Sequence, residues 1–229
     1  VGAPVLAVLI GWFGWRGPYI TLAALAAVAC VVVVAAIAPP DRPSGRPAVD
    51  PESARGRLPR TAWAPLIGTA TTAAAGISTF VLSGAWLDDA YGLSTGGLGL
   101  VAAAFGLVEL VSSTSVAMRG DRIGARRSAM CGLVVLATGA AIMLSAGGSR
   151  AVAITGLLVF LTGFEFSFVS ALTLVTEAAP DARGRAIGIS SAMGTITRAT
   201  SIVAAGQLYE TFGMTGTLSM AVGCAAVAF

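Results

Sequence analysis

Long apolar stretches alternate with short polar segments along the whole chain. A helix rises ~1.5 Å per residue, so about 20 apolar residues cross the ~30 Å hydrocarbon core of a bilayer. The pattern predicts six complete membrane-spanning helices, at residues 19–38, 62–86, 96–118, 128–146, 151–175 and 186–208. Two more apolar stretches, 1–13 and 214–229, are cut off by the ends of the sequence, which starts at Val1 rather than Met. We therefore expect the chain to be a fragment of a longer protein.

One polar segment is much longer than the others. Residues 39–61 contain six prolines and five arginines with almost no apolar run, which indicates an extended, solvated connector. The chain is then divided into helices at 1–38, a connector at 39–61 and a helical bundle at 62–229. An alternative role for the connector is a site for lipid headgroups or a partner, formed by its five arginines.

Composition agrees with a membrane protein. Of the 229 residues, 56% are hydrophobic and 11% charged, a balance that no water-soluble domain of this size sustains. The fold class expected is therefore an all-α integral membrane bundle. The three cysteines, Cys30, Cys131 and Cys224, lie inside apolar segments, where neither a disulfide framework nor a thiolate metal site is expected.

Residue types that enzymes depend on are missing. The sequence contains no His and no Lys, which excludes zinc sites of the HExxH type and hydrolases with Ser–His or Ser–Lys pairs. The glycines are scattered and form no phosphate-binding loop of the Walker type. We expect no enzymatic activity, no cofactor, no metal and no nucleic-acid partner.

The arginines are distributed unevenly between the polar segments. Alternate segments hold most of the fourteen, the remaining segments hold only Arg16 and Arg150, and Arg198 lies inside a span. By the positive-inside rule the arginine-rich segments face the cytoplasm, which places Asp88, Asp89 and Glu210 on the outer side. The arginines assigned to the cytoplasmic side are Arg42, Arg46, Arg55, Arg57, Arg60, Arg119, Arg122, Arg126, Arg127, Arg183 and Arg185.

Three ionisable residues, Glu109, Glu165 and Arg198, fall near the middle of predicted spans. A charge at that depth costs on the order of 3 kcal/mol, so each residue must be neutral, paired or exposed to a wet cavity. We expect Glu165 and Arg198 to pair or to share a water-filled cavity. A partly desolvated carboxyl can exchange a proton near neutral pH, which makes Glu109 and Glu165 candidates for proton coupling. The alternative is a buried polar clasp between helices with no part in transport.

Small and hydroxyl-bearing residues accompany these charges. Gly106, Ser112 and Ser113 lie three or four residues from Glu109, on the same stripe of a helix. The 62–86 span carries Thr and Ser residues together with Phe80 and Trp86. These residues either line a path for an amphiphilic organic substrate or bond to their own helix, and the second interpretation is favoured. The hydroxyl residues are Thr69, Thr71, Thr72, Ser78, Thr79 and Ser83.

The polar segment between the 96–118 and 128–146 spans is short and basic, and we expect a tight turn there, with Gly124 at positive φ. Its Asp121, Arg122, Gly124, Arg126 and Arg127 resemble the G-x-x-x-D-R-x-G-R-[KR]-[KR] loop of the major facilitator superfamily. Ala117 and Ala125 replace the leading Gly and the first basic residue of that loop. The resemblance implies a conformational-switch loop; the alternative is an anchor on the cytoplasmic face and nothing more.

Two flanking stretches resemble the same superfamily, in the order the fold requires. Gly2 and Pro4, followed by residues 11–18, resemble the fifth helix of drug/proton antiporter-type exporters and the start of the sixth. Residues 177–186 resemble the turn before the eleventh helix. The chain would thus run from late helix five to a truncated helix twelve. Gly2 and Pro4 would help to seal the two halves together; the alternative is an ordinary flexible kink.

The resemblance implies a secondary transporter of the bacterial cytoplasmic (inner) membrane. Its members bind substrate between two six-helix halves that rock against each other. The expected function is proton-coupled efflux of small organic compounds, by a protein that is monomeric when full length. Two alternatives stay open: an importer of a small metabolite, and a helical bundle that does not transport.

Overall fold

The computed structural model describes residues 9, 13, 14, 16–36 and 58–228, without the side chains of residues 117 and 119–123. The chain divides into two compact units, Val1–Pro51 and Glu52–Phe229. Within the described residues of the first unit lies α2 (Gly17–Ala36), an apolar helix of 20 residues whose side chains are mostly exposed. The sequence pattern predicted this helix at 19–38.

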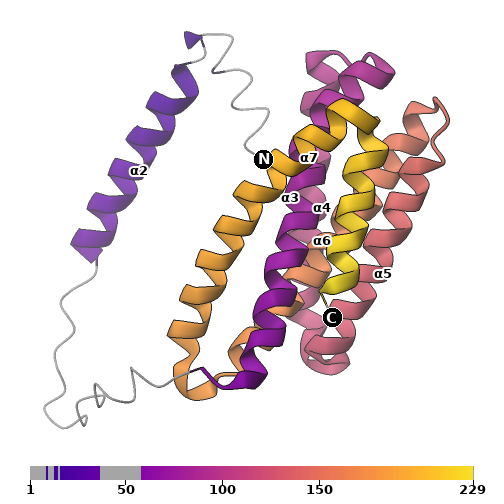
Figure 1. Ribbon diagram of the computed structural model, residues 1–229. Coiled ribbons are helices and arrows are strands. Elements are labelled where there is room, and N and C mark those ends of the chain that lie inside the picture. The colour runs from indigo at the N-terminus through magenta and orange to yellow at the C-terminus, as the bar shows by residue number, and fades with distance from the viewer. Residues whose placement is uncertain (1–8, 10–12, 15, 37–57, 229) are drawn as a thin grey trace, which may run out of the picture. The chain divides into compact units, whose positions relative to one another are not determined.

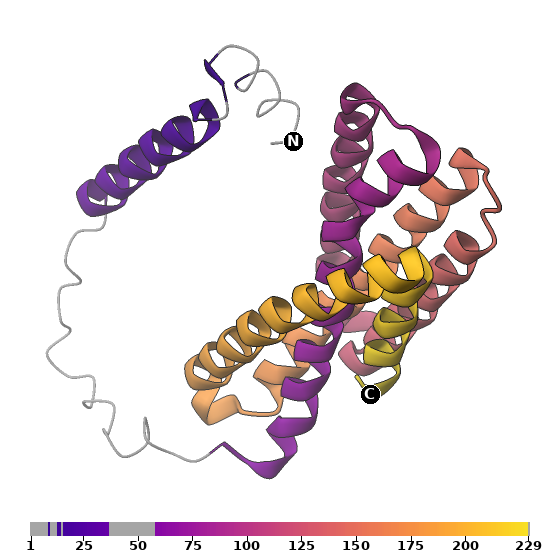
Figure 2. The ribbon, with the colours of Figure 1, turned by 45° about the horizontal axis from the view of Figure 1, so that its top comes forward.

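The second unit is an up-and-down bundle of long helices (Figure 1). A short 3-10 turn, η2 (Arg60–Ala62), precedes the first long helix, and a second one, η3 (Pro180–Ala182), joins the last two helices. Gly213, with φ 63° and ψ −156°, divides the last helix into two segments. Figure 2 shows the second segment, in yellow, turning back after this break. The helices are α3 (Trp63–Tyr91), α4 (Thr95–Ile123), α5 (Ala125–Leu144), α6 (Arg150–Glu177) and α7 (Arg183–Val227).

Five helices in the described part of the chain are long and apolar enough to cross a membrane: Gly17–Ala36, Arg60–Tyr91, Thr95–Val116, Ala125–Leu144 and Arg150–Glu177. They confirm five of the six predicted spans and the all-α membrane fold. The predicted 186–208 span corresponds to the first segment of α7, which is helical but less apolar because it carries Arg198 among many Ser, Thr and Gly residues. The partial span at 214–229 is the second segment of α7. The partial span at 1–13 lies almost wholly outside the described residues.

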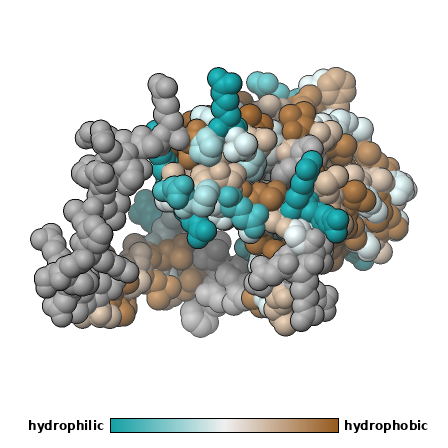
Figure 3. Space-filling model, turned by 90° about the horizontal axis from the view of Figure 1, so that it is seen from below, coloured by the Kyte–Doolittle hydropathy of each residue, from teal (hydrophilic) through white to brown (hydrophobic). Residues whose placement is uncertain are grey.

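Arginines gather at one end of the second unit. Because successive helices run in opposite directions, the start of α3, the α4–α5 turn and the α6–α7 connection meet at the same end. We call this the arginine-rich end; it holds Arg60, Arg126, Arg127, Arg183 and Arg185. Figure 3 looks at this face, where hydrophilic residues in teal cluster. The opposite end holds Asp88, Asp89, Arg150 and Glu210, and there the Tyr209 hydroxyl donates a hydrogen bond of 3.1 Å to Asp89, which joins α7 to α3.

The basic turn is shorter than expected. We expected a turn over residues 121–127, whereas α4 continues to Ile123 and α5 begins at Ala125, so only Gly124 separates the two helices. One residue suffices because Gly124 adopts φ 85° and ψ 136°, a conformation open to glycine and strained for other residues. The predicted positive φ at Gly124 is confirmed.

Replacing Gly124 by Ala is expected to lower the free energy of unfolding by about 1–2 kcal/mol, because a Cβ is strained at this φ. The measurement is the midpoint of thermal unfolding of the full-length protein in detergent. Gly184→Ala is the matched control, because Gly184 is exposed at the same end of the bundle, in the first turn of α7, with open space around it. Equal midpoints for the two variants would contradict the strain argument.

Helices α5 and α6 make the most extensive contact in the bundle, and glycines form it. A Cβ built on Gly139 would lie 2.8 Å from the Gly156 carbonyl oxygen, and one on Gly163 would lie 2.6 Å from the Gly132 carbonyl oxygen. The two backbones therefore approach as closely as only small residues allow, as is typical of helix pairs in membranes. This contact fixes α6, which carries Glu165, against the rest of the unit.

Candidate functional site

A cavity of about 480 Å³ lies between α3, α4, α6 and α7. This volume is typical of sites that bind small organic molecules. Its lining combines apolar and aromatic side chains with three charged residues. The residues that line it are Gly76, Ile77, Phe80, Phe105, Val108, Glu109, Ser113, Leu161, Phe164, Glu165, Phe168, Val169 and Arg198.

The three charged residues lie at the same depth because each sits near the middle of its helix. Glu109 is midway between Thr95 and Ile123, the ends of α4. Glu165 is close to the midpoint of α6, and Arg198 is midway along the first segment of α7. The structure therefore brings Glu109, Glu165 and Arg198 from three different helices to one cavity.

Helical periodicity explains which side chains reach the cavity. On α4, Phe105, Glu109 and Ser113 follow one another at intervals of four residues and share one face. Ser112, which the sequence grouped with Glu109, is instead buried. On α6, Glu165 lies between Phe164 and Phe168, and all three line the cavity.

Four phenylalanines give the cavity two aromatic walls. The rings of Phe80 and Phe105 lie 5.6 Å apart between centroids, which joins α3 to α4. Phe164 and Phe168 stack at the same distance along α6. Gly76 leaves room for the Phe164 ring, because a Cβ at this position would lie 2.6 Å from the ring Cζ atom.

The charges are close enough to interact without forming a direct ion pair. Glu165 is half-buried and interacts electrostatically with both Glu109 and Arg198. In the described part of the chain, no carboxylate oxygen lies within 4.0 Å of the Arg198 guanidinium. That group instead lies over Phe168, with its Cζ atom 5.4 Å from the ring centroid, in a cation–π contact. The arrangement leaves both signs of charge facing one cavity.

Most hydroxyl groups of α3 are used within the helix, the interpretation favoured from the sequence. The hydroxyl of Thr69 donates to the Pro65 carbonyl at 2.7 Å, and that of Ser78 to the Ala74 carbonyl at 2.7 Å. Thr71 and Ser83 bond to their own helix in the same way. Thr72 and Thr79 are buried without a hydrogen-bond partner among the described residues. Of the side chains noted in this span, Phe80 lines the cavity, whereas Trp86 packs in the core against Tyr91.

Sequence reasoning did not identify the aromatic residues Phe105, Phe164 and Phe168, or Gly76. A weak signal for three of them was present: Phe105 precedes Glu109 by four residues, and Phe164 and Phe168 flank Glu165 at helical spacing. For Gly76 the sequence offers no such signal, because its role depends on a ring from another helix.

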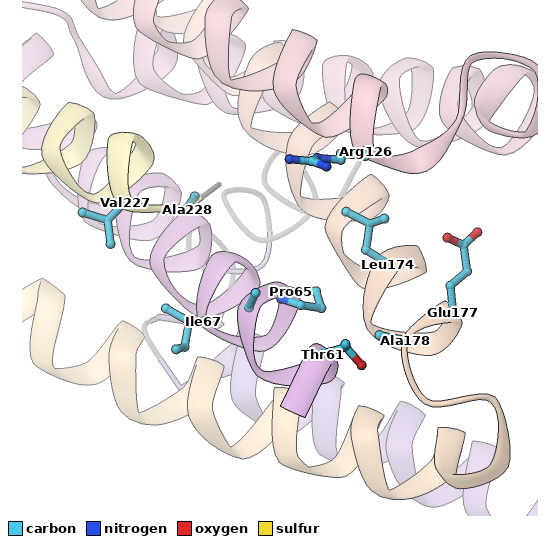
Figure 4. Close-up of a pocket in the computed structure, with 10 residues that line it drawn as sticks. Thr61, Pro65, Ile67, Arg126, Leu174, Glu177, Ala178, Val227 and Ala228 are labelled. Atoms are coloured by element: carbon cyan, nitrogen blue, oxygen red, sulfur yellow. The ribbon is translucent and has the colours of Figure 1, made fainter. Parts of the chain in front are cut away.

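The residues of the basic turn lie far from this cavity. Arg126 and Arg127 are exposed at the start of α5. Arg126 and Glu177 line a second cavity of about 730 Å³ at the arginine-rich end, where α3, α5, α6 and the end of α7 meet (Figure 4). The side chains of Asp121 and Arg122, and the residues Gly2 and Pro4, lie outside the described part of the structure. The charged residues of the second cavity lie at helix ends, whereas those of the first cavity lie at mid-helix on three helices. The first cavity, which we call the central cavity, is therefore the better candidate site.

Comparison with known proteins agrees with the all-α membrane fold. A family model described as the Major Facilitator Superfamily matches residues 66–229, which is most of the chain. A search of curated proteins finds no match. The matched segment contains α4 to α7 and nearly all of α3, including every residue that lines the central cavity. The chain therefore belongs to the Major Facilitator Superfamily of membrane transporters.

Proposed function

We propose that this protein exports small organic compounds in exchange for protons, and that the cavity holding Glu109, Glu165 and Arg198 is the transport site. The observation that supports this proposal is the convergence of the three charged residues, each central in its helix, on a cavity with two aromatic walls. Charges at bilayer depth are costly and are kept where they serve ion or substrate movement.

The proposed coupling is a competition at the carboxylates. With Glu165 ionised, the cavity holds two negative charges and one positive charge and attracts a substrate cation or ammonium group. When Glu165 takes up a proton from the outer side, that attraction weakens and the substrate leaves. Alternating access moves the cavity between the two sides, so proton entry and substrate exit share one cycle. The charged groups of the described residues that line the cavity are Glu109, Glu165 and Arg198.

In this proposal the arginine-rich end faces the cytoplasm of a bacterial cell, as the positive-inside rule favours. Gly124 joins α4 and α5 through a single residue, so a tilt of α4, which carries Glu109, is transmitted to α5. Arg126 and Arg127 at that turn are then available for contact with anionic lipid headgroups. The turn would thus act as the conformational switch.

Inside-out membrane vesicles that contain the full-length protein test the direction and the coupling. Two aromatic probes are offered from outside: ethidium, a permanent cation, and 4-(aminomethyl)benzoate, a zwitterion. We expect an acidic interior to drive accumulation of at least one of them, and a protonophore to abolish it. Vesicles without the protein give the background. If neither probe accumulates above that background, the proposal fails.

The alternative is an importer driven by proton symport. Such a protein would release a preloaded probe faster from vesicles with an acidic interior, because protons and substrate would leave together. The same vesicles, loaded before the gradient is imposed, therefore distinguish the two directions.

A further inference from the structure

Arg198 places a positive charge in the cavity, and no carboxylate of the described side chains is directly bonded to it. Its contact with the Phe168 ring offsets only part of the cost of a guanidinium at bilayer depth. A guanidinium presents five N–H donors in a planar fork that fits a carboxylate, and an aromatic ring offers no carboxylate-like acceptor for that fork. Arg198 therefore keeps the capacity to bind an anionic group that enters the cavity.

Negative charge faces the same space from two other helices. Glu109 on α4 and Glu165 on α6 both line the cavity, and Glu165 interacts electrostatically with Arg198. The rings of Phe80, Phe105, Phe164 and Phe168 line the same cavity. The lining is thus complementary to a molecule with one positive group, one negative group and an aromatic body.

We propose that the cavity selects zwitterionic aromatic compounds. The substrate carboxylate binds Arg198, its ammonium group binds Glu165 or Glu109, and its ring packs between the two phenylalanine pairs. This inference rests on the proposed function in one respect, that the same cavity is the transport site. It also explains how substrate and proton are coupled, because the ammonium group and the proton compete for the same carboxylate.

Compounds with a single charge fit this lining less well. A cation leaves Arg198 without a partner of opposite charge, and an anion leaves Glu109 and Glu165 without one. A site also rejects an analogue that leaves one of its own polar groups unpaired. Specificity for zwitterions thus comes from pairing charges of both signs in one cavity, which neither singly charged class can do.

Equilibrium binding to the full-length protein in lipid nanodiscs tests the inference without any pH gradient. The probes are 4-(aminomethyl)benzoate, 4-methylbenzylamine and 4-methylbenzoate, which share one shape and differ in charge at neutral pH. We expect the zwitterion to bind at least about tenfold more tightly than either of the others, since each of them leaves a charged group of the cavity unpaired. Equal affinities, tighter binding of the amine or no binding of the zwitterion would overturn the inference.

Substitutions at Arg198 test whether the substrate carboxylate binds this residue. Arg198→Gln is expected to weaken the binding of the zwitterion and of 4-methylbenzoate by about tenfold or more, while 4-methylbenzylamine binds as before or more tightly. Arg198→Lys keeps the charge and loses the planar fork, so its affinity for these two probes should lie between those of the wild type and the Gln variant. Arg150→Gln is the matched control, because Arg150 is exposed at the start of α6 and does not line the cavity. Uniform weakening of all three probes by Arg198→Gln, with Arg198→Lys no better, would overturn the assignment.

The two proposals fail in different measurements. A preference for the zwitterion at equilibrium without uptake driven by a pH gradient would reject proton-coupled export and leave the substrate class standing. Uptake driven by the gradient without that preference would reject the substrate class alone.

Discussion

Replacing Glu165 by Gln is expected to reduce uptake driven by a pH gradient by at least about 100-fold, the scale on which a positioned proton-transfer group acts. Gln has nearly the shape of Glu but cannot bind and release a proton, so the cavity is kept and the coupling is lost. The rate of probe accumulation in inside-out vesicles with an acidic interior, at matched protein content, is the measurement.

Two further variants give this experiment its controls. Glu177→Gln makes the same substitution at the end of the same helix, where the side chain is exposed and outside the central cavity, and it should transport like the wild type. Glu109→Gln is expected to give an intermediate rate, because Glu109 lines the cavity but is more exposed than Glu165. Normal gradient-driven uptake by the Glu165 variant would show that Glu165 is part of a structural clasp and not of the coupling.

Replacing Gly139 by Ala is expected to destabilise the bundle by about 1–3 kcal/mol, the usual range for overpacking of a tight contact. The added methyl group would collide with the backbone of Phe160 and would lie 2.8 Å from the Gly156 carbonyl oxygen, so α5 and α6 would have to separate. Backbone atoms cannot move aside as a flexible side chain can. The thermal unfolding midpoint in detergent should fall by several degrees.

Gly223→Ala is the control for this second prediction. Gly223 lies in the second segment of α7 and is exposed, and a Cβ added there would meet no atom within 4 Å, so Ala should raise helix stability by up to about 1 kcal/mol. The same substitution is therefore expected to act with opposite sign at the two positions. A stabilised Gly139 variant would contradict the close contact between α5 and α6.

The helices were largely predictable because the thickness of a bilayer imposes a length on apolar stretches. Helix ends were less predictable, since hydropathy reports where the apolar layer ends and not where the hydrogen-bonded helix ends. The prediction stopped one helix at residue 118, whereas α4 continues through the polar residues to Ile123. Similarly, the predicted gap between 208 and 214 is helical up to Gly213, where a positive φ breaks the helix.

The charged residues of the site were predictable because ionisable groups are rare in membrane spans. The aromatic walls were not, since a phenylalanine in such a span faces lipid as readily as a cavity, and the choice depends on neighbouring helices. Phe164 illustrates this: its ring occupies space that Gly76 leaves on another helix. The sequence also could not show that Arg198 lies over Phe168 instead of pairing directly with Glu165.

Protonation of Glu165 itself is the most direct test of the account, because it needs no substrate. Infrared difference spectra of the full-length protein in nanodiscs, recorded between acidic and alkaline pH, report the C=O stretch of protonated carboxyl groups. We expect a band that titrates with pH in the wild type and in Glu177→Gln, and that disappears in Glu165→Gln. An unchanged spectrum in the Glu165 variant would contradict the assignment of Glu165 as the group that exchanges the proton.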